Sequence, residues 1–140
     1  MGTINWGRVL AGGLLAGLVL NVWDFVLNGV ILANDWNAAM RSLGKGEMTG
    51  SLIVWFVLYD FLFGIFMIWF YAAIRPRYGA GPKTAALAGL TLWLLVGVLH
   101  AIGEAPIGLF PMKLYTIPVL AGFIAAPLAA LVGAGPYKEA

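Results

Sequence analysis

Four ionisable side chains lie within or at the ends of long apolar stretches of this 140-residue chain, where charged groups are unusual. They are Asp24, Asp60, His100 and Glu104. A charged side chain in the centre of a bilayer costs about 2.5–3.5 kcal/mol on insertion scales, so each of these residues needs a partner or a role. Two carboxyl groups at close range can share a proton, because two like charges disfavour each other. One hypothesis is therefore a proton or cation site.

The depth of the two aspartates supports their grouping. Asp24 lies nine residues before Ala33, the end of the first apolar run, and Asp60 lies nine residues after Ser51, the start of the second. At 1.5 Å per residue, both are about 13 Å below the same membrane surface. We therefore predict one polar cluster in the half of the molecule that faces away from the N-terminus. Its members are Asn21, Asp24, Asn28, Asp60, His100 and Glu104.

The same residues could instead act only in helix packing. Asn21, Asp24 and Asn28 recur at steps of three or four, so they share one helix face. Polar side chains in membrane helices often hydrogen-bond to a neighbouring helix and contribute about 1 kcal/mol each. Small residues at similar spacing also predict close helix contacts. The glycines that we expect at these contacts are Gly13, Gly17, Gly64, Gly97 and Gly122.

His100 is the only histidine, and Glu104 follows it by one helical turn, so the two side chains can pair. A histidine in a membrane helix could also ligate haem or a chlorophyll-type magnesium. One histidine serves only one side of a haem, and the chain has neither a second histidine nor a Cys-x-x-Cys-His motif. The absence of cysteine also excludes thiolate metal sites. We expect no cofactor and no metal site, and a hydrogen-bonded structural role for His100.

Composition places the chain in the membrane class. Hydrophobic residues make up 62% and charged residues 10%, with a mean hydropathy of +0.94. A soluble domain is typically about 45–50% apolar and about 25% charged. Apolar runs of 18 or more residues predict spanning helices, because about 20 residues cross a hydrocarbon core of about 30 Å. The runs predict an all-α, four-helix transmembrane bundle as a single domain over 1–140, with spans at about 9–33, 51–74, 85–103 and 114–132.

The connection between the first two spans carries a helix signal. Asn34 and Asp35 are helix-capping residues, apolar residues one turn apart follow them, and Gly44 ends the pattern. We expect a short helix over 35–43 on the membrane surface. Basic residues favour one side of the membrane by five to three, which predicts that both termini are cytoplasmic. The five are Arg8, Arg75, Arg77, Lys83 and Lys138, and the three are Arg41, Lys45 and Lys113.

Reaction and nucleic-acid motifs are missing from the sequence. It contains no nucleophile elbow and no glycine-rich phosphate loop between a strand and a helix. Its densest basic cluster is the pair Arg75 and Arg77, which is too sparse for a nucleic-acid surface. We therefore expect no enzymatic activity and no nucleic-acid partner. The expected partners are the lipid bilayer, other membrane subunits or further copies of the chain.

Three segments carry a resemblance to known sequences: Ile4 to Leu10, the capped loop at Trp36 to Leu43, and the Lys113-Leu114-Tyr115 entry to the fourth span. They resemble uncharacterised bacterial four-span integral membrane proteins of the domain-of-unknown-function type. The resemblance covers the whole chain in topology and implies residence in a bacterial cytoplasmic membrane. Small multidrug transporters and fluoride channels are similar in size, but their characteristic residues are not found at matching positions.

Two functions follow as hypotheses. The first is a small non-catalytic membrane protein that acts as an accessory or packing subunit of a membrane complex, or as a homo-oligomer. The alternative is a small transporter or channel coupled to protons or cations, which would use the acid and histidine cluster.

Overall fold

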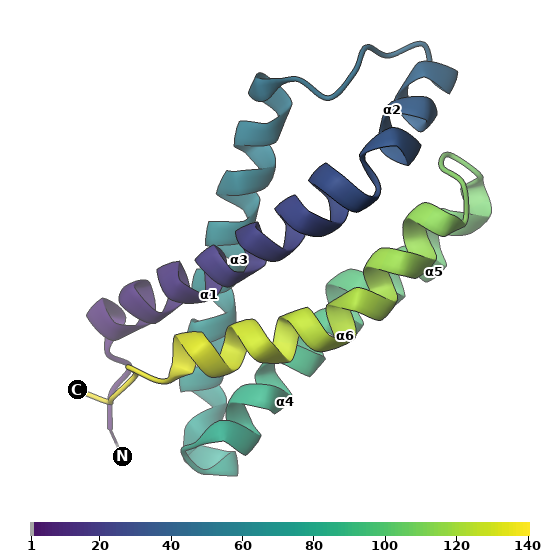
Figure 1. Ribbon diagram of the computed structural model, residues 1–140. Coiled ribbons are helices and arrows are strands. Elements are labelled where there is room, and N and C mark those ends of the chain that lie inside the picture. The colour runs from purple at the N-terminus through teal and green to yellow at the C-terminus, as the bar shows by residue number, and fades with distance from the viewer. Residues whose placement is uncertain (1) are drawn as a thin grey trace.

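The computed structural model describes residues 2–140, and all regular structure in that range is helical. Four helical stretches are long and apolar enough to cross a membrane: Trp6–Ile31, Gly50–Tyr78, Pro82–Ile107 and Lys113–Ala134. They pack as a bundle, with one short helix between the first two (Figure 1). The predicted all-α bundle with an intervening short helix is therefore confirmed.

The first spanning stretch is built from two elements. Helix α1 covers Trp6–Val26, and the Asn5 side chain caps it by accepting a hydrogen bond from the backbone N–H of Arg8 at 3.1 Å. A wider π-helical turn, η1, continues it over Leu27–Ile31. The short helix α2 then covers Ala33–Ser42. The expected capping by Asn34 or Asp35 is wrong, because α2 begins directly after Leu32 and both residues already lie inside it.

Helix α3 covers Gly50–Tyr78 and is longer than the apolar run that predicts it. It continues through Pro76, two residues before its end, where the proline lacks the N–H that would bond to the carbonyl oxygen of Ala72. The following turn uses Gly79 and Gly81, whose φ angles are 85° and 125°. Such positive φ angles favour glycine because it has no Cβ.

The third stretch consists of four consecutive elements: α4 (Pro82–Leu92), the π-helical η2 (Trp93–Leu99), α5 (His100–Glu104) and the 3₁₀ turn η3 (Ala105–Ile107). Pro82 occupies the first turn of α4, where its fixed φ suits a helix start. Helix α6 covers Lys113–Ala134.

The core is asymmetric along the bundle. At one end, which we call the Arg75 end, all four spans converge on buried residues such as Val9, Met67 and Ile68. Their neighbours are mostly alanines, which let the backbones approach closely. At the opposite end, the α2 end, a second small core joins Leu32, Ala39 and Leu114. Toward this end α3 diverges from α1 (Figure 1).

Candidate functional site

A chain of polar contacts leads from α2 into the bundle. The indole N–H of Trp36 donates to Asn28 Oδ1 at 3.0 Å, and Asn28 Nδ2 donates to Asp24 Oδ1 at 3.4 Å. The Asp24 carboxyl group in turn lies close to that of Asp60. Asp60 is only 4% exposed. These four residues, with Asn21, form what we call the Asp24–Asp60 group.

The Asp24–Asp60 contact has a chemical consequence. Two carboxylates at close range repel each other, so sharing one proton between them is favourable. Asn21 lies beside the pair, where its Nδ2 donates to Gly17 O at 2.9 Å and to Val57 O at 3.4 Å. The group can therefore hold a proton, and it also fixes α1 against α3.

The other two predicted site residues lie elsewhere. His100 Nε2 contacts Glu104 Oε2 at 2.7 Å, and Tyr115 OH donates to Glu104 Oε1 at 2.9 Å. The His100 side chain is 63% exposed and that of Glu104 is 25% exposed. This Glu104 group connects α5 to the start of α6. The i,i+4 pairing expected for His100 and Glu104 is thus present in the structure.

The structure brings the six predicted residues together in two groups. Asn21, Asp24, Asn28 and Asp60 belong to the first, and His100 and Glu104 to the second. Within residues 2–140, no hydrogen bond or ion pair joins the groups, and no three acidic or histidine side chains lie close enough to hold a metal ion.

Two members of these groups, Trp36 and Tyr115, were not among the predicted site residues. Trp36 joins the first group because α2 folds back toward η1, and Tyr115 joins the second because α6 lies beside α5. Neither relationship follows from spacing along one helix. Their partners are 8 and 11 residues away, across a break in the helix.

The small-residue contacts differ partly from the expected set. Gly13 and Gly17 of α1 pack directly against the α3 backbone, and Gly64 packs against both of them. Gly122 lies under the Trp93 ring, whereas a Cβ on Gly97 would meet only Trp93 of its own helix. The tightest approach between α1 and α6 is made by Gly12 and Gly133, which were not in the expected set.

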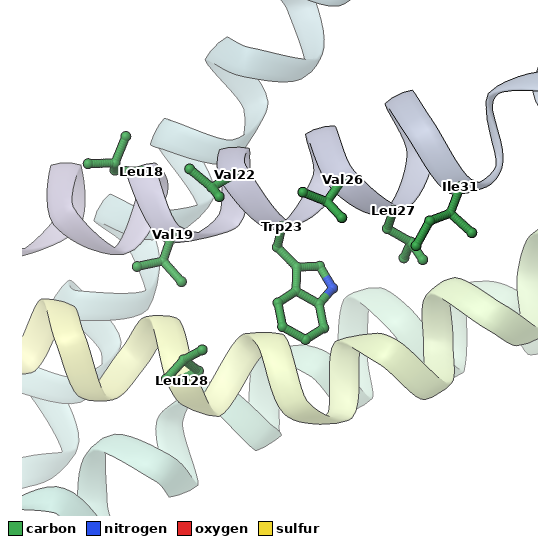
Figure 2. Close-up of a pocket in the computed structure, with 8 residues that line it drawn as sticks. All are labelled: Leu18, Val19, Val22, Trp23, Val26, Leu27, Ile31 and Leu128. Carbon is green, nitrogen blue, oxygen red and sulfur yellow. The ribbon is translucent and has the colours of Figure 1, made fainter.

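An apolar groove of about 590 Å³ lies between the second half of α1 and α6, with Trp23 at its centre (Figure 2). Its lining is aliphatic apart from this ring. The Trp23 N–H is buried without a hydrogen-bond partner, unlike those of Trp36 and Trp93, which donate to Asn28 and to Val119 O. The groove faces the hydrocarbon region if the helices span a membrane, so lipid chains can fill it.

Comparisons with models of known protein families, with curated protein sequences and with solved structures give no match.

Proposed function

We propose that this chain is a non-catalytic subunit of a membrane assembly, formed with further copies of itself or with another membrane chain. The observation that carries the proposal is the exposed first third of α3. All ten residues of Gly50–Tyr59 are exposed, on every side of the helix. Three of them are large aromatic side chains, Trp55, Phe56 and Tyr59.

The position of this exposed segment favours a protein partner over lipid alone. The segment diverges from α1 next to the Asp24–Asp60 group, in which Asn21, Asp24 and Asn28 are only partly buried. Polar groups that face hydrocarbon are costly, and a neighbouring helix with polar or small residues removes that cost. A partner helix between the diverging ends of α1 and α3 would cover both the aromatic side chains and the polar edge.

The opposite end of the bundle supports the same proposal. After Asp60, the next buried residues of α3 are Gly64, Met67 and Ile68, all apolar, and no buried polar side chain follows until Tyr71. The polar chain that starts at Trp36 therefore ends at Asp60. A contact surface needs polar groups at only one depth, whereas a transport path needs them along the whole span.

Site-directed crosslinking tests the proposal, because the chain has no native cysteine. Val54→Cys places a thiol on the exposed segment Gly50–Tyr59 of α3, where Val54 is 64% exposed. Leu120→Cys is the matched control on α6, at 66% exposure. In native membranes, a bismaleimide should link the Val54→Cys protein into a defined dimer or hetero-complex and leave the control monomeric. Equal crosslinking at both sites, or none at Val54→Cys in a protein that is monomeric by native mass spectrometry, would contradict the proposal.

A second candidate function is proton- or cation-coupled transport, which the proximity of the Asp24 and Asp60 carboxyl groups supports. Asp60→Asn keeps the size and hydrogen-bonding capacity of the side chain but cannot exchange a proton. Asp35→Asn is the control, because the Asp35 side chain lies in α2, outside the Asp24–Asp60 group, and is 37% exposed. Loss of proton-linked flux in liposomes only in Asp60→Asn, with unchanged thermal stability, would favour the carrier. Flux that is equal in both variants and in empty liposomes would exclude it.

A further inference from the structure

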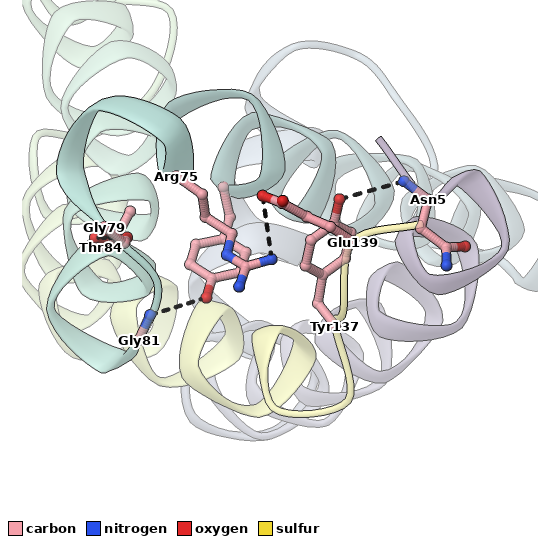
Figure 3. A network of polar contacts seen from close by, with 8 residues as sticks. Asn5, Arg75, Gly79, Gly81, Thr84, Tyr137 and Glu139 are labelled. Atoms are coloured by element: carbon pink, nitrogen blue, oxygen red, sulfur yellow. Dashed lines mark hydrogen bonds and ion pairs between the residues drawn. The ribbon is translucent and has the colours of Figure 1, made fainter. Parts of the chain in front are cut away.

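Arg75 lies one turn before the end of α3, in an aromatic clamp. Its guanidinium carbon is 5.5 Å from the centre of the Tyr71 ring and 5.0 Å from that of Tyr137. Figure 3 shows Arg75 together with Tyr137 and Glu139. Both rings are held by their hydroxyl groups: Gly81 N donates to Tyr71 OH at 3.2 Å, and Asn5 N donates to Tyr137 OH at 3.3 Å. The side chain of Arg75 is only 15% exposed. The cation therefore has a built environment rather than a free surface position.

The hydrogen-bonding capacity of this buried cation is not satisfied. Arg75 Nε and Nη1 are both buried and have no hydrogen-bond partner. The nearest acidic group is Glu139, whose Oε1 lies 3.6 Å from Nη1, which is longer than a hydrogen bond. This ion pair is long and leaves two buried N–H groups without acceptors, so desolvation of the guanidinium is only partly compensated. A closer anion would bind Arg75 more strongly than Glu139 does.

A cavity of about 340 Å³ adjoins the guanidinium. Tyr71, Arg75 and Tyr137 line it together with Gly81 and Pro82, at the start of α4. The N-terminus of a helix carries partial positive charge and favours an anion. The cavity thus combines a guanidinium, a helix start and two rings that keep water away from the charge.

The Arg75 end of the molecule is also strongly basic. In 2–8, 75–84 and 135–140, the segments that meet there, five residues are basic and one is acidic. The basic residues are Arg8, Arg75, Arg77, Lys83 and Lys138, and the acidic residue is Glu139. Such an imbalance raises the local concentration of anions.

We propose that this cavity binds a phosphate group, which takes the place of the Glu139 carboxylate on Arg75. A guanidinium matches the oxygens of a phosphate with paired N–H donors. The cavity lies between the ends of α3 and α6 and the start of α4, which is the depth of lipid headgroups if these helices span a membrane. Basic pockets between membrane helices commonly bind anionic headgroups. The phosphate comes from an anionic phospholipid or from a soluble phosphate ester.

Glu139 acts as an internal competitor in this proposal. Its segment is attached to the start of the chain through Asn5 N to Tyr137 OH and through Ala140 N to Thr3 O at 3.2 Å. The backbone can therefore stay in place while the Glu139 side chain rotates away. Removing its charge should strengthen phosphate binding, whereas removing the charge of Arg75 should weaken it.

The test uses the full chain in dodecyl maltoside, titrated with phosphatidylglycerol and, separately, with phosphatidylcholine, and followed by native mass spectrometry. Arg75→Gln should lower the affinity for phosphatidylglycerol by roughly tenfold or more, as expected for loss of a charge-assisted contact. Glu139→Gln should raise it several-fold. Arg77→Gln, two residues away and exposed, removes the same charge and should change the affinity by less than about threefold.

Competition with sn-glycerol 3-phosphate distinguishes the two sources of the phosphate group, an anionic phospholipid and a soluble phosphate ester. If it displaces the lipid and follows the same order of variants, the site takes soluble phosphate esters as well. If it does not, the lipid headgroup is the ligand. Equal losses in Arg75→Gln and Arg77→Gln would overturn the proposal, because diffuse surface charge would then explain the binding. Should Arg75→Gln fail to fold, an unchanged affinity in Glu139→Gln would overturn it instead.

Discussion

Gly12 of α1 and Gly133 of α6 face each other so closely that a Cβ added to either would collide with the carbonyl oxygen of the other. Ile68 of α3 borders both glycines. Three helices therefore meet at this point, near the Arg75 end.

Gly12→Ala should destabilise the protein by about 1–3 kcal/mol, because the new methyl group forces α1 away from α6 and this cost exceeds the gain in helix propensity. Gly103→Ala is the matched control, since a Cβ there meets nothing within 4 Å. The control should be neutral or slightly stabilising. Unfolding in mixed micelles of dodecyl maltoside and dodecyl sulfate measures both. Equal stability of the two variants would contradict the close contact.

Trp93→Phe and Trp23→Phe should differ although the chemical change is the same. Trp93 Nε1 donates to Val119 O at 2.8 Å, whereas Trp23 Nε1 has no partner. Both variants lose ring area, but only the first loses a hydrogen bond, which within a membrane is worth about 0.6–1.7 kcal/mol. Trp93→Phe should be less stable than Trp23→Phe by about 1 kcal/mol in the same unfolding assay. The reverse order would show that ring area dominates.

The Trp36–Asn28 hydrogen bond should control how firmly α2 is held. Asn28→Ala removes the acceptor at 3.0 Å, and the amide hydrogens of α2 should then exchange faster, because its second attachment is the exposed Asp35–Lys113 pair. Asn34→Ala changes the same residue type at an exposed position of α2. Hydrogen exchange read by mass spectrometry should show faster exchange only in the first variant. Unchanged exchange in Asn28→Ala would mean that the small apolar core alone holds α2.

The ion pair between Asp35 and Lys113 should contribute little. Lys113 Nζ contacts both carboxylate oxygens, at 3.1 and 3.0 Å, but the side chains are 37% and 54% exposed. A double-mutant cycle with Asp35→Asn and Lys113→Gln should give a coupling of about 0.2–1 kcal/mol that decreases with salt. The Arg41–Glu47 pair, at 3.4 Å and with both partners more than 60% exposed, should give almost none. A salt-independent coupling at Asp35–Lys113 would point to a buried interaction instead.

The four-helix architecture could be predicted because hydrocarbon restricts the backbone to few solutions. Each apolar run is long enough to span, and a spanning segment in lipid must satisfy its own backbone hydrogen bonds, as a helix does. The short helix α2 was also predictable, since its apolar residues lie one turn apart. Its start was not, because Leu32 and the π-helical turn η1 lead into it without a capping side chain.

Polar contacts within one helix could be predicted from the sequence, whereas polar contacts between helices could not. Spacing along one helix predicted that His100 pairs with Glu104 and that Asn28 lies next to Asp24. In each pair the two residues are four positions apart and therefore share a helix face. That Asp24 meets Asp60, and that Glu104 meets Tyr115 rather than Asp24, depends on how the helices cross. Depth along the membrane was available from the sequence, but rotation about each helix axis and the crossing angles were not.

The sequence by itself therefore determined the class of the protein, the number of its helices and the face on which each polar or small residue lies. The tertiary structure alone decided that these faces form two separate polar groups, that the first third of α3 stays exposed, and that Arg75 is enclosed by Tyr71 and Tyr137. The physical reason is the range of the interactions. Hydropathy and helical periodicity act within one segment, whereas contacts between segments depend on close packing of small residues such as Gly12 and Gly133.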